Sequence, residues 1–72
     1  MQSSFSKILK QKRTQARLSQ EMLAQRLFVT KPTVARWESG TRLPDAAMIV
    51  KIAECLDTDV AALLNAAAQK RL

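Results

Sequence analysis

Hydrogen-bonding side chains are concentrated in one short stretch of the chain, FVTKPTVARWESG. Lys31, Thr33 and Arg36 alternate there with the apolar residues Val34 and Trp37. On a helix Val34 and Trp37 share one face, because they are three residues apart, and the three polar residues lie outside it. Lysine and arginine can donate to O6 and N7 of guanine, and threonine can offer its hydroxyl or methyl group to a base edge. These residue types therefore suit hydrogen bonding to a nucleic acid.

The positive charge of the chain is distributed unevenly. The 72 residues include 12 Lys or Arg and 6 Asp or Glu, which gives a net charge of +6. Residues 1–36 carry eight of the basic residues and one acid, Glu21, whereas residues 37–72 carry four bases and five acids. This excess in the first half indicates a surface that faces a polyanion, although a solvated surface that favours solubility would have the same composition.

The residue types needed for most catalytic and metal sites are missing. There is no His, and Cys55 is the only cysteine, which excludes an internal disulfide and argues against a zinc site. No Gly-rich phosphate loop or cluster of carboxylates occurs, so we expect neither an enzyme nor a bound cofactor. The longest apolar runs are too short for a membrane span or a signal peptide, and we therefore expect a cytoplasmic protein with no membrane partner.

Helical spacing of apolar residues runs through the whole chain, which contains only one Gly and two Pro. We expect one small all-α domain over residues 1–72, a compact five-helix bundle. The expected helices span 4–16, 20–27, 31–38, 46–56 and 59–68. The expected N-caps of the last four helices are Ser19, Thr30, Asp45 and Thr58, and Gly40 is expected to end the third helix.

The same spacing predicts which side chains face the core. Trp37 could stack on a base, but the face that it shares with Val34 favours burial. Asp57 and Asp59 are interpreted as charges that favour the start of the last helix. Further residues expected in the core or at its edge are Phe5, Leu9, Ala16, Met22, Met48 and Cys55.

The second and third helices are joined by about three residues, as in a helix-turn-helix, over about residues 19–38. In that motif the second helix lies in the major groove of DNA with its first residues at base edges. Any two amphipathic helices could give the same spacing, so the pattern does not decide the function alone.

A family resemblance is carried by three stretches together: LSQEMLAQRL, VTKPTVARWESG and RLPDAAMIVKIAECL. Through them the chain resembles the Cro/C1-type helix-turn-helix family of lambdoid phage repressor-like or XRE-like domains. The resemblance runs from about Phe5 to Leu64. It implies a lambda repressor-like fold and a transcriptional regulator, most often a repressor, that binds operator sites in double-stranded DNA. It also implies a bacterial or phage-encoded protein that acts at the nucleoid and usually forms a dimer.

The resemblance further implies roles for individual residues. The residues that it places at DNA bases are Lys31, Pro32, Thr33 and Arg36. The residues that it places at DNA phosphates are Gln20, Thr30, Ser39 and Arg42. It pairs Arg13 with Glu38 in a partly buried salt bridge, and a phosphate contact is the alternative for Arg13.

Two positions depart from the family pattern, which often has Gly where this chain has Arg17 and Phe28. Both residues tolerate a positive φ poorly, so either the turns adopt other angles or the backbone stores strain. Phe28 could also cover the edge of the core. Pro32 cannot donate a hydrogen bond and offers only a van der Waals surface to a base.

The last helix leaves two alternatives open. Leu63, Leu64 and Ala67 could complete the core, or they could form the interface of a homodimer. An apolar interface there also motivates a second function, a protein-interaction module such as an antitoxin-like or regulatory subunit in which DNA binding is secondary.

Overall fold

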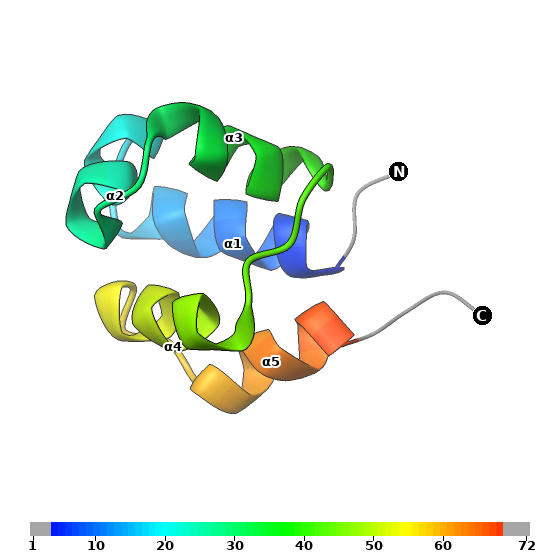
Figure 1. Cartoon of the computed structure of the whole chain (residues 1–72). Helices are drawn as coiled ribbons and strands as arrows, with labels where there is room; N and C mark the ends of the chain where they lie inside the picture. The colour runs from blue at the N-terminus through cyan, green and yellow to red at the C-terminus, as the bar shows by residue number, and fades with distance from the viewer. Residues whose placement is uncertain (1–3, 69–72) are drawn as a thin grey trace.

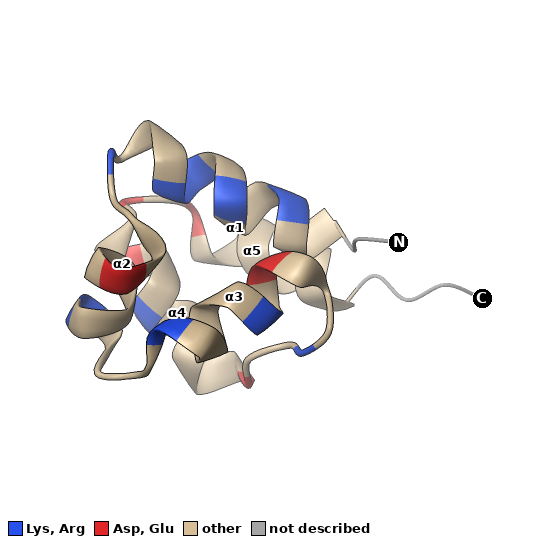
Figure 2. Ribbon diagram, turned by 90° about the horizontal axis from the view of Figure 1, so that it is seen from above, with Lys and Arg blue, Asp and Glu red and all other residues tan. Residues whose placement is uncertain are grey.

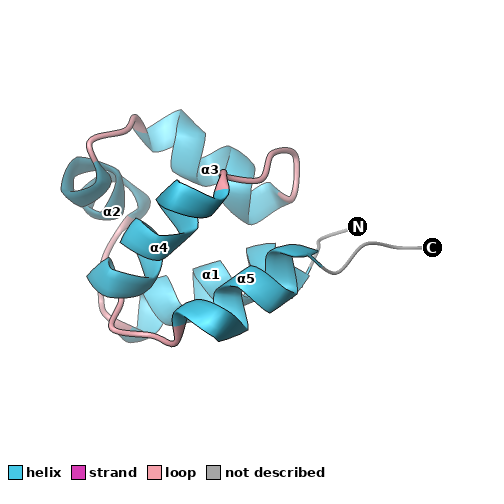
Figure 3. Ribbon diagram, turned by 60° about the horizontal axis from the view of Figure 1, so that its bottom comes forward, coloured by secondary structure: helices cyan, strands magenta, loops and turns pink. Residues whose placement is uncertain are grey.

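The structure is a computed structural model that describes residues 4–68. Its five helices are α1 (Ser4–Gln15), α2 (Gln20–Leu27), α3 (Lys31–Ser39), α4 (Ala46–Cys55) and α5 (Val60–Ala68). Residues 4–68 form no strand (Figure 3). The predicted all-α fold is confirmed, and each predicted helix boundary lies within one residue of the observed boundary.

The helices close around a single core. α1 contacts both α3 and α5, α2 packs against α3 and α4, and α4 packs against α5. Figure 1 shows α2 and α3 on one side of α1, and α4 and α5 on the other. Val34 and Trp37 lie in this core with exposed fractions of 0% and 5%. The core position predicted for Trp37 is therefore confirmed.

Two of the predicted N-caps have the expected hydrogen bonds. The Ser19 hydroxyl accepts from the Met22 N–H of α2 at 3.0 Å. The Asp45 carboxylate accepts from the Met48 N–H of α4 at 2.8 Å. Each side chain satisfies an N–H group that has no partner within the helix, which fixes where α2 and α4 begin.

The other two predicted N-caps have different outcomes: Thr30 is the N-cap of α3 but makes no capping bond with its side chain, and Thr58 does not cap α5. Thr30 has the extended backbone of an N-cap, but its hydroxyl bonds to the Thr33 hydroxyl at 2.9 Å and not to a backbone N–H. At α5 the prediction of Thr58 is wrong, because the carboxylate of Asp59 accepts from the Ala61 N–H at 3.1 Å. Aspartate and threonine are both capping residues, so the pattern alone could not separate adjacent candidates.

Within residues 4–68, three residues other than glycine have a positive φ: Arg17 (62°), Phe28 (59°) and Asp57 (52°). Left-handed backbone costs a residue with a Cβ about 1–2 kcal/mol, so the two departures from glycine do store strain. Asp57 follows the end of α4, so its interpretation as a helix-start charge is wrong. Phe28 is 95% exposed and does not cover the core.

Several predictions of core packing are also settled. Ala16 is exposed, because α1 ends at Gln15 and the chain turns away before it can face the core. Met22 is 43% exposed on α2 and does not pack against the core, so its predicted place in the core or at its edge is wrong. Met48 and Cys55 are half-buried against the core, as predicted.

Candidate nucleic-acid interface

The third helix presents two distinct faces. Val34, Trp37 and Glu38 are buried, whereas Lys31 and Arg36 are exposed. The buried face is held by contacts with α1 and α2. Because α3 turns 100° per residue, this contact face directs Pro32, Arg36 and Ser39 away from the core. The polar face predicted from the sequence is therefore present on the surface of α3.

A buried salt bridge anchors the inner face of α3 to α1. Arg13 donates through Nε to Oε2 of Glu38 at 2.5 Å and through Nη2 to Oε1 at 3.1 Å. Its Nη1 donates to the Leu18 carbonyl at 2.7 Å. The Arg13 and Glu38 side chains are 11% and 4% exposed. The two-point contact satisfies the carboxylate and fixes its orientation, and the salt bridge implied by the family resemblance is present.

The salt bridge extends to the start of α2. Gln20, the first residue of α2, donates its side-chain amide to Oε1 of Glu38 at 3.1 Å. Arg13, Gln20 and Glu38 thus connect α1, α2 and α3 through one carboxylate. The Gln20 amide carries a second hydrogen, which is available to an acceptor outside the helices.

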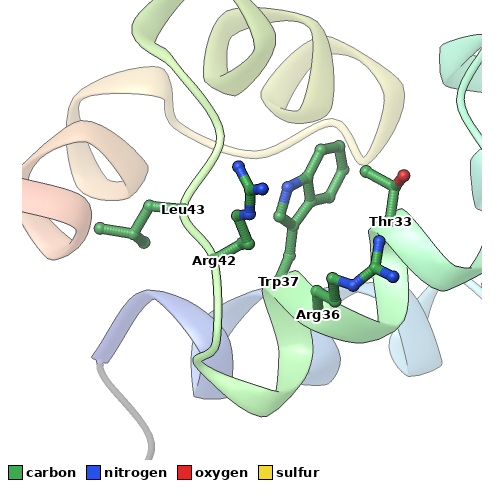
Figure 4. A pocket seen from close by; sticks show the side chains of 5 residues that line it. All are labelled: Thr33, Arg36, Trp37, Arg42 and Leu43. Atoms are coloured by element: carbon green, nitrogen blue, oxygen red, sulfur yellow. The ribbon is translucent and has the colours of Figure 1, made fainter.

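A hollow of about 270 Å³ lies beside α3, lined by Thr33, Arg36 and Trp37 together with Arg42 and Leu43 of the following loop. Figure 4 shows the Arg36 and Arg42 side chains on either side of the Trp37 indole. Two guanidinium groups, separated in sequence, are thereby brought to one edge of the helix. Arginine presents several donors in a fixed plane and is suited to phosphate and guanine acceptors.

The remaining predicted contact residues lie at the two ends of α3. Lys31 and Pro32 are exposed at its first turn, next to the bonded hydroxyls of Thr30 and Thr33. At the other end, the Ser39 hydroxyl donates to the Arg36 carbonyl at 3.1 Å and bonds to the Thr41 hydroxyl at 2.8 Å. Gly40 ends the helix with φ 84°, as predicted, and turns the chain so that Arg42 returns beside Arg36.

Basic residues outnumber acidic ones on α1, α2 and α3 taken together. Figure 2 shows Lys and Arg on α1, on α3 and on the loop that follows α3. The acidic Glu38 of α3 is buried in its salt bridge with Arg13 and does not face the solvent. The exposed face of α3 therefore carries positive charge without an opposing carboxylate of its own.

One residue of this surface was not predicted. Leu43 is 49% exposed at the rim of the hollow. The sequence signal was its position between Arg42 and Pro44, in an extended segment where no helical face could bury it. Among residues 4–68, no group of three or more His, Cys, Asp or Glu residues could hold a metal ion. None of the helices α1–α5 is both long enough and apolar enough to span a bilayer.

Comparison with known proteins decides the family. A protein-family profile described as helix-turn-helix matches residues 9–63. The chain belongs to the Cro/C1-type helix-turn-helix family. It is 32% identical over 68 residues to the uncharacterized HTH-type transcriptional regulator YqaE of Bacillus subtilis, and 33% identical over 61 residues to the HTH-type transcriptional activator BcrR of Enterococcus faecalis. The matches include 94% and 85% of this chain, but only 59% and 30% of the lengths of these two relatives.

Solved structures with the same fold include a protein of similar length. The restriction-modification controller protein C.AhdI of Aeromonas hydrophila is 34% identical, with a TM-score of 0.76, over 82% of this chain and 86% of that protein. Hydroxypropylphosphonic acid epoxidase of S. wedmorenis is 35% identical with a TM-score of 0.75. The match covers 85% of this chain but only 32% of the epoxidase, so the likeness concerns the helical region alone.

Proposed function

We propose that this chain is a transcriptional regulator that binds double-stranded DNA sequence-specifically by placing α3 in the major groove. The observation that carries the proposal is the outward face of α3, where Arg36 and Thr33 meet Arg42 around one hollow. A helix with its apolar side fixed to the core and its donors exposed has the shape that the groove admits. The similarity to two transcriptional regulators supports the same function.

Within this proposal, the exposed residues divide by their position on α3. Lys31, Thr33 and Arg36 read base edges, and Pro32 packs against a base, for example a thymine methyl group. The residues that fix the register on the DNA backbone are Gln20, Thr30, Ser39 and Arg42. Gln20 has the additional advantage of lying at the N-terminus of α2, where backbone N–H groups favour a phosphate.

We further propose that the regulator represses transcription in a bacterial cell by occupying an operator and excluding polymerase. A binding site that overlaps a promoter should lower the output of a reporter gene in cells that express the chain. An increase in reporter output would show that the chain activates transcription and does not repress it. The DNA-binding proposal would be unaffected.

A homodimer that pairs two half-sites completes the proposal. Leu63 is 1% exposed and belongs to the core, so it cannot contribute to the interface as expected. Leu64 and Ala67 are half-buried and remain available. α5 contains no charged residue, so two copies of a positively charged chain can meet there without repulsion.

The decisive experiment is selection of bound sites from a random duplex library, followed by affinity measurements across a salt series. Arg36→Ala should relax specificity at one base position by about 1–3 kcal/mol, whereas Arg42→Ala should weaken all sequences and reduce the salt slope by about 1. Gln11→Ala, on the exposed side of α1, is the matched control and should change neither the base specificity nor the salt slope. Equal affinity for selected and random duplexes would refute sequence-specific binding.

A protein-interaction module remains the second candidate function, although the observation that favours it has changed. In the apolar stripe of α5 that first motivated it, Leu63 is covered by the core, and the half-buried Leu64 and Ala67 are assigned to the proposed homodimer. The exposed aromatic residue Phe28 favours it instead.

A further inference from the structure

Phe28 combines two unfavourable features at one position. Its φ of 59° is a conformation that glycine adopts without strain, and its side chain is 95% exposed. Neither feature contributes to the core. Strained backbone persists where the surrounding structure enforces it, and it occurs often at ligand-binding positions. A large apolar side chain held in water in this way is explained if a partner covers it.

The turn that carries Phe28 is firmly held. The Phe28 N–H donates to the Gln25 carbonyl at 3.3 Å, and the Val29 N–H donates to the Ala24 carbonyl at 2.9 Å. Leu27 on one side is buried in the core. The exposed aromatic ring therefore belongs to a held turn between α2 and α3. Figure 1 shows where the chain passes from α2 to α3. A backbone that is fixed before binding loses less entropy when the residue is bound.

A hollow of about 390 Å³ includes Phe28 in its lining. Leu27, Phe28 and Cys55 give it apolar walls, and the exposed side chains of Arg26, Lys51 and Glu54 surround them. It shares no residue with the hollow beside α3. This second surface, which we call the Phe28 surface, thus contains none of the candidate DNA-contacting residues.

The charges around the hollow indicate its occupant. Two cations and one carboxylate give the Phe28 surface a net positive charge, which favours an acidic partner. The Glu54 carboxylate and the apolar walls disfavour the sugar-phosphate backbone of a nucleic acid. A second copy of this chain would bring Arg26 and Lys51 against the same pair of cations. A protein segment with an apolar side chain between carboxylates satisfies all of these features.

We propose that the Phe28 surface docks a segment of another protein in which an apolar or aromatic residue is flanked by Asp or Glu. The apolar residue enters the hollow against Phe28, and the carboxylates meet Arg26 and Lys51. The inference does not depend on DNA binding. It gives the chain a second contact surface through which a partner could be held while α3 remains exposed.

The experiment uses a display library of random 12-residue peptides as the probe. Selection on the chain should enrich peptides with an aromatic or aliphatic residue next to acidic residues. Phe28→Gly should weaken their binding at least tenfold, and Lys51→Glu should weaken it as well. Met22→Ser, which alters an exposed apolar residue on α2 outside the Phe28 surface, is the matched control and should leave binding unchanged. Phe28→Gly relieves strain, so its loss of binding would not arise from unfolding.

Several outcomes would overturn the proposal. Peptides that bind Phe28→Gly as tightly as the original chain would show that the ring is not the docking element. Enrichment of basic peptides would contradict the proposal that the partner is acidic. Enrichment of no peptide above a scrambled control would contradict it as well. A fall in DNA affinity on Phe28→Gly would assign the residue to the DNA interface. Self-association that is lost in Phe28→Gly would assign it to a contact between copies.

Discussion

Removal of the Arg13 guanidinium tests how strongly the helices depend on the buried salt bridge. In Arg13→Met the Glu38 carboxylate, 4% exposed in its side chain, loses both Arg13 contacts and keeps the Gln20 amide as a donor. Breaking one partner of a buried pair costs about 3–5 kcal/mol. A chain of 72 residues has a free energy of unfolding of about 4–11 kcal/mol at typical values per residue. The free energy lost in Arg13→Met is therefore a large part of the total free energy of unfolding.

The predicted loss is measurable by thermal and urea unfolding, followed by circular dichroism. Each 1 kcal/mol shifts the melting temperature of a domain this small by about 4–8 °C, so a loss of about 3–5 kcal/mol in Arg13→Met should lower the melting temperature by about 12–40 °C. Lys10→Met, on the exposed side of the same helix, is the matched control and should change the free energy by no more than about 0.5 kcal/mol.

A double variant separates the cost of an unpaired charge from the value of the pair. Arg13→Met with Glu38→Leu removes both charges, and an apolar replacement of a buried pair is often neutral or stabilising. We expect the double variant to be more stable than Arg13→Met alone. A loss below about 1 kcal/mol in Arg13→Met, or a double variant less stable than both single variants, would refute the reasoning.

Three further predictions concern the turns, the helix starts and the dimer. Phe28→Gly should raise the free energy of unfolding by about 1 kcal/mol, because glycine adopts the positive φ without strain; an unchanged or lower melting temperature would contradict stored strain. In urea unfolding, Asp45→Ala should cost about 1 kcal/mol, whereas Thr30→Ala should cost less, because the Thr30 hydroxyl caps no backbone N–H; equal losses would contradict the capping geometry. In sedimentation experiments, Leu64→Asp should convert the proposed homodimer to a monomer, while Gln11→Asp should leave the proposed homodimer intact. A dimer that survives Leu64→Asp would exclude α5 as the interface.

The parts of the fold that were predictable depend on interactions between residues close in sequence. Ser19 and Asp45 cap the helices that directly follow them, and Gly40 ends α3 within its own turn. The burial of Val34 and Trp37 follows from their spacing on one helix. In each case the deciding contact lies within about one helical turn, so the sequence pattern contains it.

The parts that were not predictable depend on where separate segments meet. Periodicity gave Leu63 an apolar helix position but could not tell whether the core or a second chain would cover it. Residue type alone did not show that Phe28 would be strained and exposed together, since a turn with other angles could have buried it. The bond from Gln20 to Glu38 spans 18 residues and joins α2 to α3, and no local pattern encodes it.

The buried network also explains why the outward face of α3 is well defined. Glu38 and Arg36 are two residues apart and point about 200° from each other around the helix. Because Arg13 and Gln20 hold Glu38 on the inside, Arg36 is directed outward beside Arg42. A rotation of α3 by one position would draw the carboxylate away from both donors and expose part of Trp37. The network that contributes to stability thus also fixes the rotation of the helix proposed to read DNA, so loosening it should lower specificity before it abolishes folding.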